Sequence, residues 1–67
     1  MPISYNKLWK ILIDNNMNKT QLKNAANIST NIVAKMGRDE PVSLETLVKI
    51  SLVLQVDIGD IVEIKKN

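Results

Sequence analysis

The chain has 67 residues, 45% of them hydrophobic, and a formal net charge of +2, with neither cysteine nor histidine. This length suits one domain spanning residues 1–67. The missing residue types exclude disulfides, thiolate chemistry and the common catalytic triads, and they argue strongly against a zinc site. We therefore expect no enzymatic activity, no cofactor and no metal.

The charge is distributed unevenly along the chain. Residues 15–38 carry four positive charges and no negative one, whereas residues 39–67 carry six acidic residues against three lysines, a net charge of −3. Such asymmetry indicates a polyanion at the basic part. An ordinary solvated surface would show the same charges, so charge alone does not choose between the two interpretations.

The first predicted helix runs from a cap at Ser4 or Asn6 to about Asn15. Its apolar residues fill an arc of roughly 200°, wider than the roughly 100° stripe that a surface helix needs. Trp9 and Ile13 exceed the needs of the core, and they pack either beneath the C-terminal segment or against a second subunit. The two aromatic residues of the chain both lie here, away from the basic stretch. A single-strand binder would need them beside its charges.

Two short helices are predicted next, at about 19–26 and 30–36, with a tight turn between them. Asn18 caps the first, and Gln21 has the capping-box spacing. Asn27 lies in the turn, where it tolerates a left-handed backbone less well than glycine would. Ser29 caps the second helix, and Gly37 is expected to end it in a left-handed conformation.

The second of these helices has an outward face made of short side chains. Val33 and Met36 are expected to face inward, which leaves Thr30, Asn31, Ile32, Ala34 and Lys35 outside. A face of this kind lets a helix lie deep in a groove about 12 Å wide. The amide of Asn31 offers a donor and an acceptor together, as adenine N6 and N7 require.

A fourth helix begins after Ser43 and continues to about Gln55. Its expected inward face comprises Leu44, Leu47, Ile50, Ser51 and Leu54. Asp57 and Asp60 have capping-box spacing for a short fifth helix over residues 58–62. The alternating tail at residues 62–65 favours a short strand that pairs with the lead-in around Ile3.

The order of caps and apolar anchors resembles that of the Cro/CI-type helix-turn-helix family, the lambda repressor-like or XRE-type DNA-binding domains. The resemblance covers nearly the whole chain. Its motifs are MNKTQL at residues 17–22, ANIS at 26–29, LQV at 54–56 and, most specifically, SLETLVKI at 43–50. It implies an all-α, compact five-helix domain whose third helix enters the major groove of double-stranded DNA.

The resemblance also implies roles for matching positions. Thr30, Asn31 and Lys35 match positions that meet base edges, and Ile32 is a further candidate because it could contact a thymine methyl group. Lys19 opens the second helix, where orphan amides attract phosphate oxygens. Further phosphate candidates are Ser29, Arg38, Lys10 and Lys23.

Four features depart from the family pattern. Asn27 replaces the usual turn glycine, and Lys23 stands where a small residue is preferred. The link between the third and fourth helices is about one residue short, which puts backbone contacts at residues 38–40 in question. Ile32 is apolar where a small polar residue is frequent.

The expected function is that of a sequence-specific transcriptional regulator, a repressor that binds a pseudo-palindromic operator as a homodimer. We expect it in the cytoplasm, bacterial or phage-encoded and associated with the nucleoid, with no membrane partner and no evident small-molecule ligand. The predicted dimer surface comprises Leu52, Val53, Ile58, Ile61, Ile64 and Trp9. The alternative is a protein-interaction module, an antitoxin or adaptor that uses the same fold.

Overall fold

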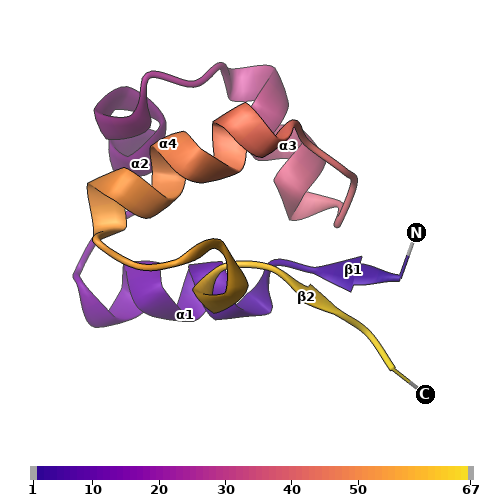
Figure 1. The fold of residues 1–67 in the computed structure, drawn as a ribbon. Coiled ribbons are helices and arrows are strands. Elements are labelled where there is room, and N and C mark those ends of the chain that lie inside the picture. Colours follow the sequence, from indigo (N-terminus) through magenta and orange to yellow (C-terminus); the bar gives the residue numbers. More distant parts are fainter. Residues whose placement is uncertain (1, 67) are drawn as a thin grey trace.

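The computed structural model describes residues 2–66. In chain order the elements are β1 (Ile3–Ser4), α1 (Asn6–Asp14), α2 (Lys19–Ala26), α3 (Thr30–Gly37), α4 (Leu44–Leu54), a 3-10 turn η1 (Ile58–Asp60) and β2 (Glu63–Ile64). Figure 1 shows α2 and α3 joined by a short link, with α4 in front of them and α1 along the opposite side of the molecule.

The predicted fifth helix is wrong, because residues 2–66 form four α-helices and residues 58–60 make only one 3-10 turn. The predicted cap is present in part, since the Asp60 carboxylate accepts a hydrogen bond from the Asp57 amide at 3.0 Å. The turn stops because Ile61 points into the core and the chain must be extended again by Glu63. Gly59, a poor helix former, weakens any continuation.

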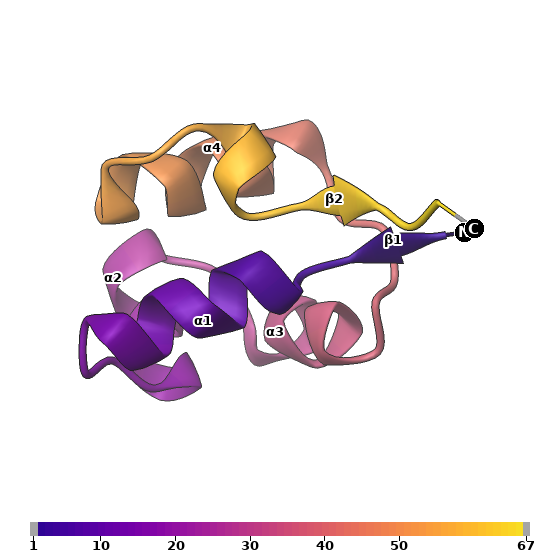
Figure 2. The same ribbon diagram turned by 90° about the horizontal axis from the view of Figure 1, so that it is seen from below.

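The predicted pairing of the tail with the lead-in is confirmed. Strands β1 and β2 are antiparallel, with Ile3 opposite Ile64 and Ser4 opposite Glu63. Figure 2 shows the two strands side by side at one end of the molecule. This short sheet ties the two ends of the described chain together, so the fold is helical with a two-stranded addition.

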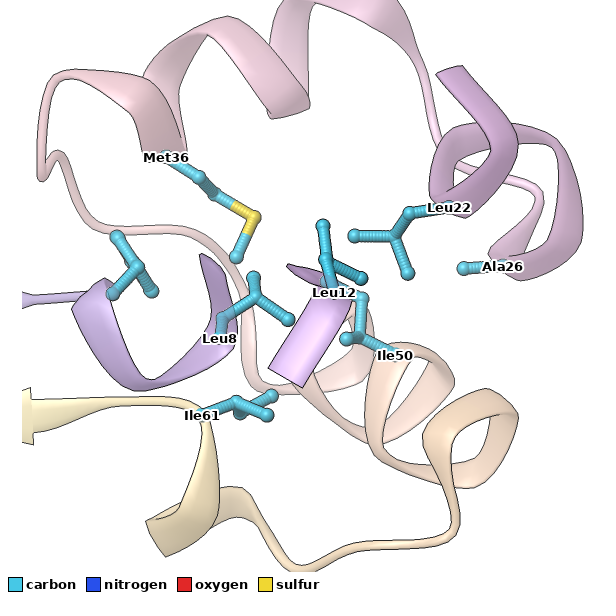
Figure 3. Packing of buried hydrophobic residues seen from close by; sticks show 8 residues of the cluster. Leu8, Leu12, Leu22, Ala26, Met36, Ile50 and Ile61 are labelled. Carbon is cyan, nitrogen blue, oxygen red and sulfur yellow. The ribbon is translucent and has the colours of Figure 1, made fainter. Parts of the chain in front are cut away.

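One hydrophobic core joins all four helices and Ile61, the residue that follows η1. Its buried members are Tyr5, Leu8, Leu12, Leu22, Ala26, Met36, Ile50 and Ile61. Figure 3 shows Met36 reaching from α3 toward Leu8 and Leu12 of α1, with Ile61 on the other side of Leu8. Leu44, expected to face inward, is 66% exposed. It begins α4 on the side turned away from this core.

The end of α3 also differs from the expectation for Gly37. This glycine stays within the helix, and the left-handed residue is Asp39, with φ of 55°. Aspartate tolerates this conformation because its short side chain can hydrogen-bond locally. Here the carboxylate instead contacts distant parts of the chain: it accepts from the Tyr5 amide at 3.3 Å and from Lys65 Nζ at 3.3 Å.

Tyr5 fixes the link between α3 and α4. Its hydroxyl donates to the main-chain oxygen of Glu40 at 2.8 Å, and its ring is buried in the core. Burial, aided by the negative charge of Asp39, raises the pKa of the Tyr5 hydroxyl. Residues 5, 39, 40 and 65 therefore hold the short link against the N-terminal end of the domain.

Replacing Tyr5 with Phe should destabilise the domain by about 1–2 kcal/mol, because the carbonyl of Glu40 loses its donor. The raised pKa means that the folded state favours the protonated hydroxyl. The hydroxyl therefore stabilises the fold below the ordinary tyrosine value of about 10, and this contribution is lost as pH rises through the higher folded-state pKa. Urea unfolding between neutral and strongly alkaline pH should show that the stability difference between wild type and the Phe variant begins to shrink above about pH 10. A constant difference would contradict the proposed role of the hydroxyl.

Candidate nucleic-acid interface

The α2–turn–α3 unit is built by local hydrogen bonds. Asn18 Oδ1 accepts from the Gln21 amide at 2.7 Å, and Gln21 Oε1 accepts from the Asn18 amide at 2.9 Å. Asn27 holds the turn with φ of 55°, so the amide residue does take the left-handed conformation usually given to glycine. Ser29 Oγ then accepts from the Ile32 amide at 3.2 Å and opens α3. The predicted range 19–26 matches α2, and the predicted range 30–36 is one residue shorter than α3.

Lys23 does not disturb the packing of the two helices. Its side chain is half-buried, and its ammonium donates to Thr30 Oγ1 at 3.4 Å. The aliphatic stem therefore lies along the surface of the turn, as long basic side chains do when their charged end remains in water. This contact places a positive charge beside the first residue of α3.

The outer face of α3 presents the predicted base-reading residues to solvent. Thr30, Asn31 and Lys35 are exposed, and Ile32 is half-buried against the core. Ala34 is also exposed and adds no bulk. The face is thus short and polar, with one cation at its C-terminal half, while Met36 anchors the opposite side.

Lys19 lies over an aromatic ring. Its Nζ is 4.5 Å from the centre of the Trp9 ring. A side chain at Gly37 would come within 3.9 Å of the same Nζ, so this ammonium sits between α1 and the C-terminal end of α3. The hollow around it is lined by Leu12, Ile13, Met17 and Asn18 as well as by Trp9. These residues come from α1 and from the connection that leads into α2, so Trp9 borders a hollow beside the start of α2.

Replacing Lys19 with Met should leave stability within about 0.5 kcal/mol of wild type. Loss of the cation–π contact removes roughly 0.5–1 kcal/mol at an exposed site, but a positive charge in the first turn of a helix costs about 0.3–1 kcal/mol through the helix dipole. The two terms nearly cancel. Urea unfolding measures the balance. The emission of the single tryptophan should change because the variant no longer places an ammonium group over the Trp9 ring. A loss well above 1 kcal/mol would make Lys19 a structural residue.

Arg38 is engaged within the chain. Its Nε lies 2.7 Å from Glu40 Oε2, and Nη2 lies 3.5 Å from Oε1. The hydrogen bond from Arg38 holds the pKa of the Glu40 carboxyl below its usual value. A phosphate would therefore compete with Glu40 for this guanidinium, which makes Arg38 a weaker phosphate candidate than its position suggests.

The remaining cations of the unit are not neutralised. The ion pairs seen among residues 2–66 join Arg38 to Glu40, Lys49 to Glu45 and Lys65 to Asp39. Lys19, Lys23 and Lys35 take part in none of them. Asp39 and Glu40, the two acidic residues directly after α3, are thus paired with other cations. The α2–α3 surface therefore keeps a net positive charge.

The predicted dimer residues differ widely in exposure. Ile61 is wrongly included, because it is completely buried in the core. Leu52 and Ile64 are strongly exposed, but they line different hollows of the surface. Val53, Ile58 and Trp9 are half-buried, and Trp9 lies beneath Lys19.

The fold and this surface define a helix-turn-helix protein. The model of the Cro/C1-type HTH DNA-binding domain matches residues 7–67, and the chain belongs to this family. None of the helices in residues 2–66 has the length and apolar character needed to cross a membrane.

Among solved structures, the chain is similar to the crystal structure of the transcriptional regulator VanUg. The two are 45% identical, with a TM-score of 0.93, and the match covers 98% of this chain and 88% of that chain. No curated protein matches the chain significantly. The comparisons support a DNA-binding regulator, as the sequence predicts.

Two features of the site were not found by sequence reasoning. The contact of Lys19 with Trp9 joins α1 to α2 across ten residues of chain, and the pairing of Arg38 with Glu40 depends on the backbone of the link. Only the adjacency of Arg38, Asp39 and Glu40 hinted at the second. Nothing in the pattern of α1 indicated that its tryptophan would meet a cation.

Proposed function

We propose that this protein is a repressor that reads a specific duplex sequence with α3 in the major groove. Asn31 and Thr30 make the principal base contacts, Lys35 adds a contact to guanine or to phosphate, and Ile32 adds an apolar one. Lys19, Lys23 and Ser29 hold the phosphates, with smaller contributions from Lys10 and Arg38. A bound dimer blocks the promoter by occupying it.

The observation that carries this proposal is the division of the exposed surface of α2 and α3. The outer face of α3 has short side chains, and unpaired ammonium groups border it from α2. Phosphate contacts position a protein on a duplex, whereas base-edge contacts select the sequence. The Ser29 hydroxyl accepts from the Ile32 amide, so its proton is free to be donated to a phosphate oxygen.

Selection of bound duplexes from a random pool tests the proposal. We expect one enriched half-site, repeated with two-fold symmetry at a spacing of about 34 Å. The affinity should fall steeply with salt, with a log–log slope of about −0.9 for each phosphate neutralised. Reporter transcription from a promoter that overlaps the selected site should fall when the protein is present.

A different outcome would favour a protein-interaction module. If no sequence is enriched and the salt slope is flat, the α2–α3 surface does not serve as a DNA-binding surface. A selected site whose promoter rises in activity would keep the DNA-binding proposal and overturn repression.

A further inference from the structure

The outer face of α4 carries an apolar stripe that the core does not use. Leu44, Val48 and Leu52 follow one another at four-residue intervals and are 66%, 41% and 73% exposed. Residues at this spacing lie on one face of a helix, and the three span about 12 Å. Single exposed apolar residues are ordinary, but a contiguous row of them marks an interaction surface.

The charges beside the stripe show which kind of partner suits it. Glu45 and Lys49 border it on the same side, with 3.9 Å between Glu45 Oε1 and Lys49 Nζ. This face of α4 is therefore neutral, in contrast to the basic α2–α3 surface. DNA selects positive surfaces, and membrane-binding helices combine apolar residues with an excess of basic ones. A neutral apolar stripe suits another protein surface.

We propose that the α4 stripe (Leu44, Val48 and Leu52) packs against the same stripe of a second copy, with the two α4 helices antiparallel and Val48 near the two-fold axis. Leu44 of each copy then meets Leu52 of the other. This proposal rests on the proposed function in one respect, which is that two copies must bind one duplex. It replaces the dispersed set of dimer residues expected from the sequence with one helix face.

Charge complementarity selects the antiparallel arrangement. A two-fold axis that lies in the plane of the contact and perpendicular to the helices brings the charged side of one α4 beside the charged side of the other. Glu45 of each copy then lies beside Lys49 of its partner. A parallel pair would put the two charged sides on opposite edges of the contact, where they could not meet.

The size of the stripe indicates a weak dimer. Stable interfaces bury about 800 Å² on each partner, and one helix face of three apolar residues with two flanking charges supplies less. Two copies held on adjacent half-sites have a high effective concentration, which strengthens a weak contact without adding new ones. The contact should therefore be detectable at millimolar protein concentration and should appear as cooperativity on DNA.

Cross-linking through a single introduced thiol tests the geometry directly. The chain has no cysteine, so Val48→Cys carries one thiol near the proposed axis, where a disulfide needs Cα atoms within about 7 Å. Under mild oxidation V48C should form a disulfide-linked dimer much faster than Ile13→Cys, a control at a 74%-exposed position of α1. Equal rates for the two variants would overturn the proposal.

Association in solution supplies a second test without DNA. Val48→Glu should abolish the dimer seen by sedimentation at millimolar concentration, and thermal unfolding should stay close to wild type because the position is on the surface. Glu45→Lys and Lys49→Glu should each weaken the dimer several-fold, and the double exchange should restore it. A dimer that V48E leaves intact, or a wild-type protein that stays monomeric, would overturn the proposal.

Binding to DNA separates this proposal from the proposed function. V48E should bind an isolated half-site as wild type does and lose cooperativity on the two-fold site. If wild-type protein binds no duplex, the proposed function fails, while sedimentation and cross-linking still decide whether α4 pairs. Unchanged cooperativity of V48E would reject the α4 contact and leave DNA reading intact.

Discussion

Replacing Met36 with Ala should destabilise the domain by about 2–5 kcal/mol, the usual cost of removing a large buried side chain and leaving a cavity. Met36 is completely buried and is the buried residue of α3. Its side chain extends toward Leu8 and Leu12 in Figure 3. A protein of this length has a total stability of about 3–10 kcal/mol, so the variant should lose a large fraction of its stability.

The same substitution should affect α3 first, because this helix has only eight residues and needs tertiary packing to persist. Urea unfolding followed by circular dichroism measures the loss. Met36→Leu is the matched control, since a change that conserves volume costs less than about 1.5 kcal/mol. If Met36→Ala unfolds at the same urea concentration as wild type, the core does not hold α3 as described.

Replacing Asn31 with Ala should lower affinity for the selected operator by roughly 5- to 150-fold, which corresponds to about 1–3 kcal/mol for a bidentate contact with adenine. Asn31 is exposed on α3, so stability should change by less than about 0.5 kcal/mol. The preference for one base pair in each half-site should disappear. Affinity for unrelated duplexes should stay the same, because those complexes depend on phosphate contacts.

Two variants provide the comparison for Asn31. Asn24→Ala removes the same amide from an exposed position of α2 and should leave operator selectivity unchanged. Lys19→Met should weaken binding to every duplex alike and reduce the salt slope by about 1. All three variants are compared by binding titrations on the operator, on operators with single-base changes and at several salt concentrations. If Asn31→Ala and Lys19→Met have the same profile, the division between base reading and phosphate binding is wrong.

Short-range patterns determined most of the helical framework. Asn18, Ser29 and Ser43 stand at the caps of α2, α3 and α4, where each side-chain oxygen accepts a backbone amide three residues on. Such capping depends on neighbours in the chain, so it can be predicted from spacing. The left-handed Asn27 follows from an equally local rule. The alternation of residues 62–65 predicts a strand, but the pairing of Ile3 with Ile64 joins the two ends of the chain.

Tertiary contacts decided how the helices end and where the side chains of the site point. Asp39, and not Gly37, takes the left-handed conformation because Tyr5 and Lys65 hold its carboxylate. Residues 58–62 do not complete a helix because Ile61 enters the core. These outcomes depend on contacts between residues far apart in the chain, and helix propensity and capping contain no information about such contacts.

The family and the helix-turn-helix unit were therefore determined by the sequence itself, since the caps and apolar anchors that define this unit are local. Only the tertiary structure decided which cations remain available: Arg38 is paired with Glu40, Lys23 reaches Thr30, and Lys19 lies over Trp9. It also placed Leu44 on the surface, where α4 offers an apolar stripe. Helical periodicity identifies a face, but the packing of the other elements determines whether that face is covered.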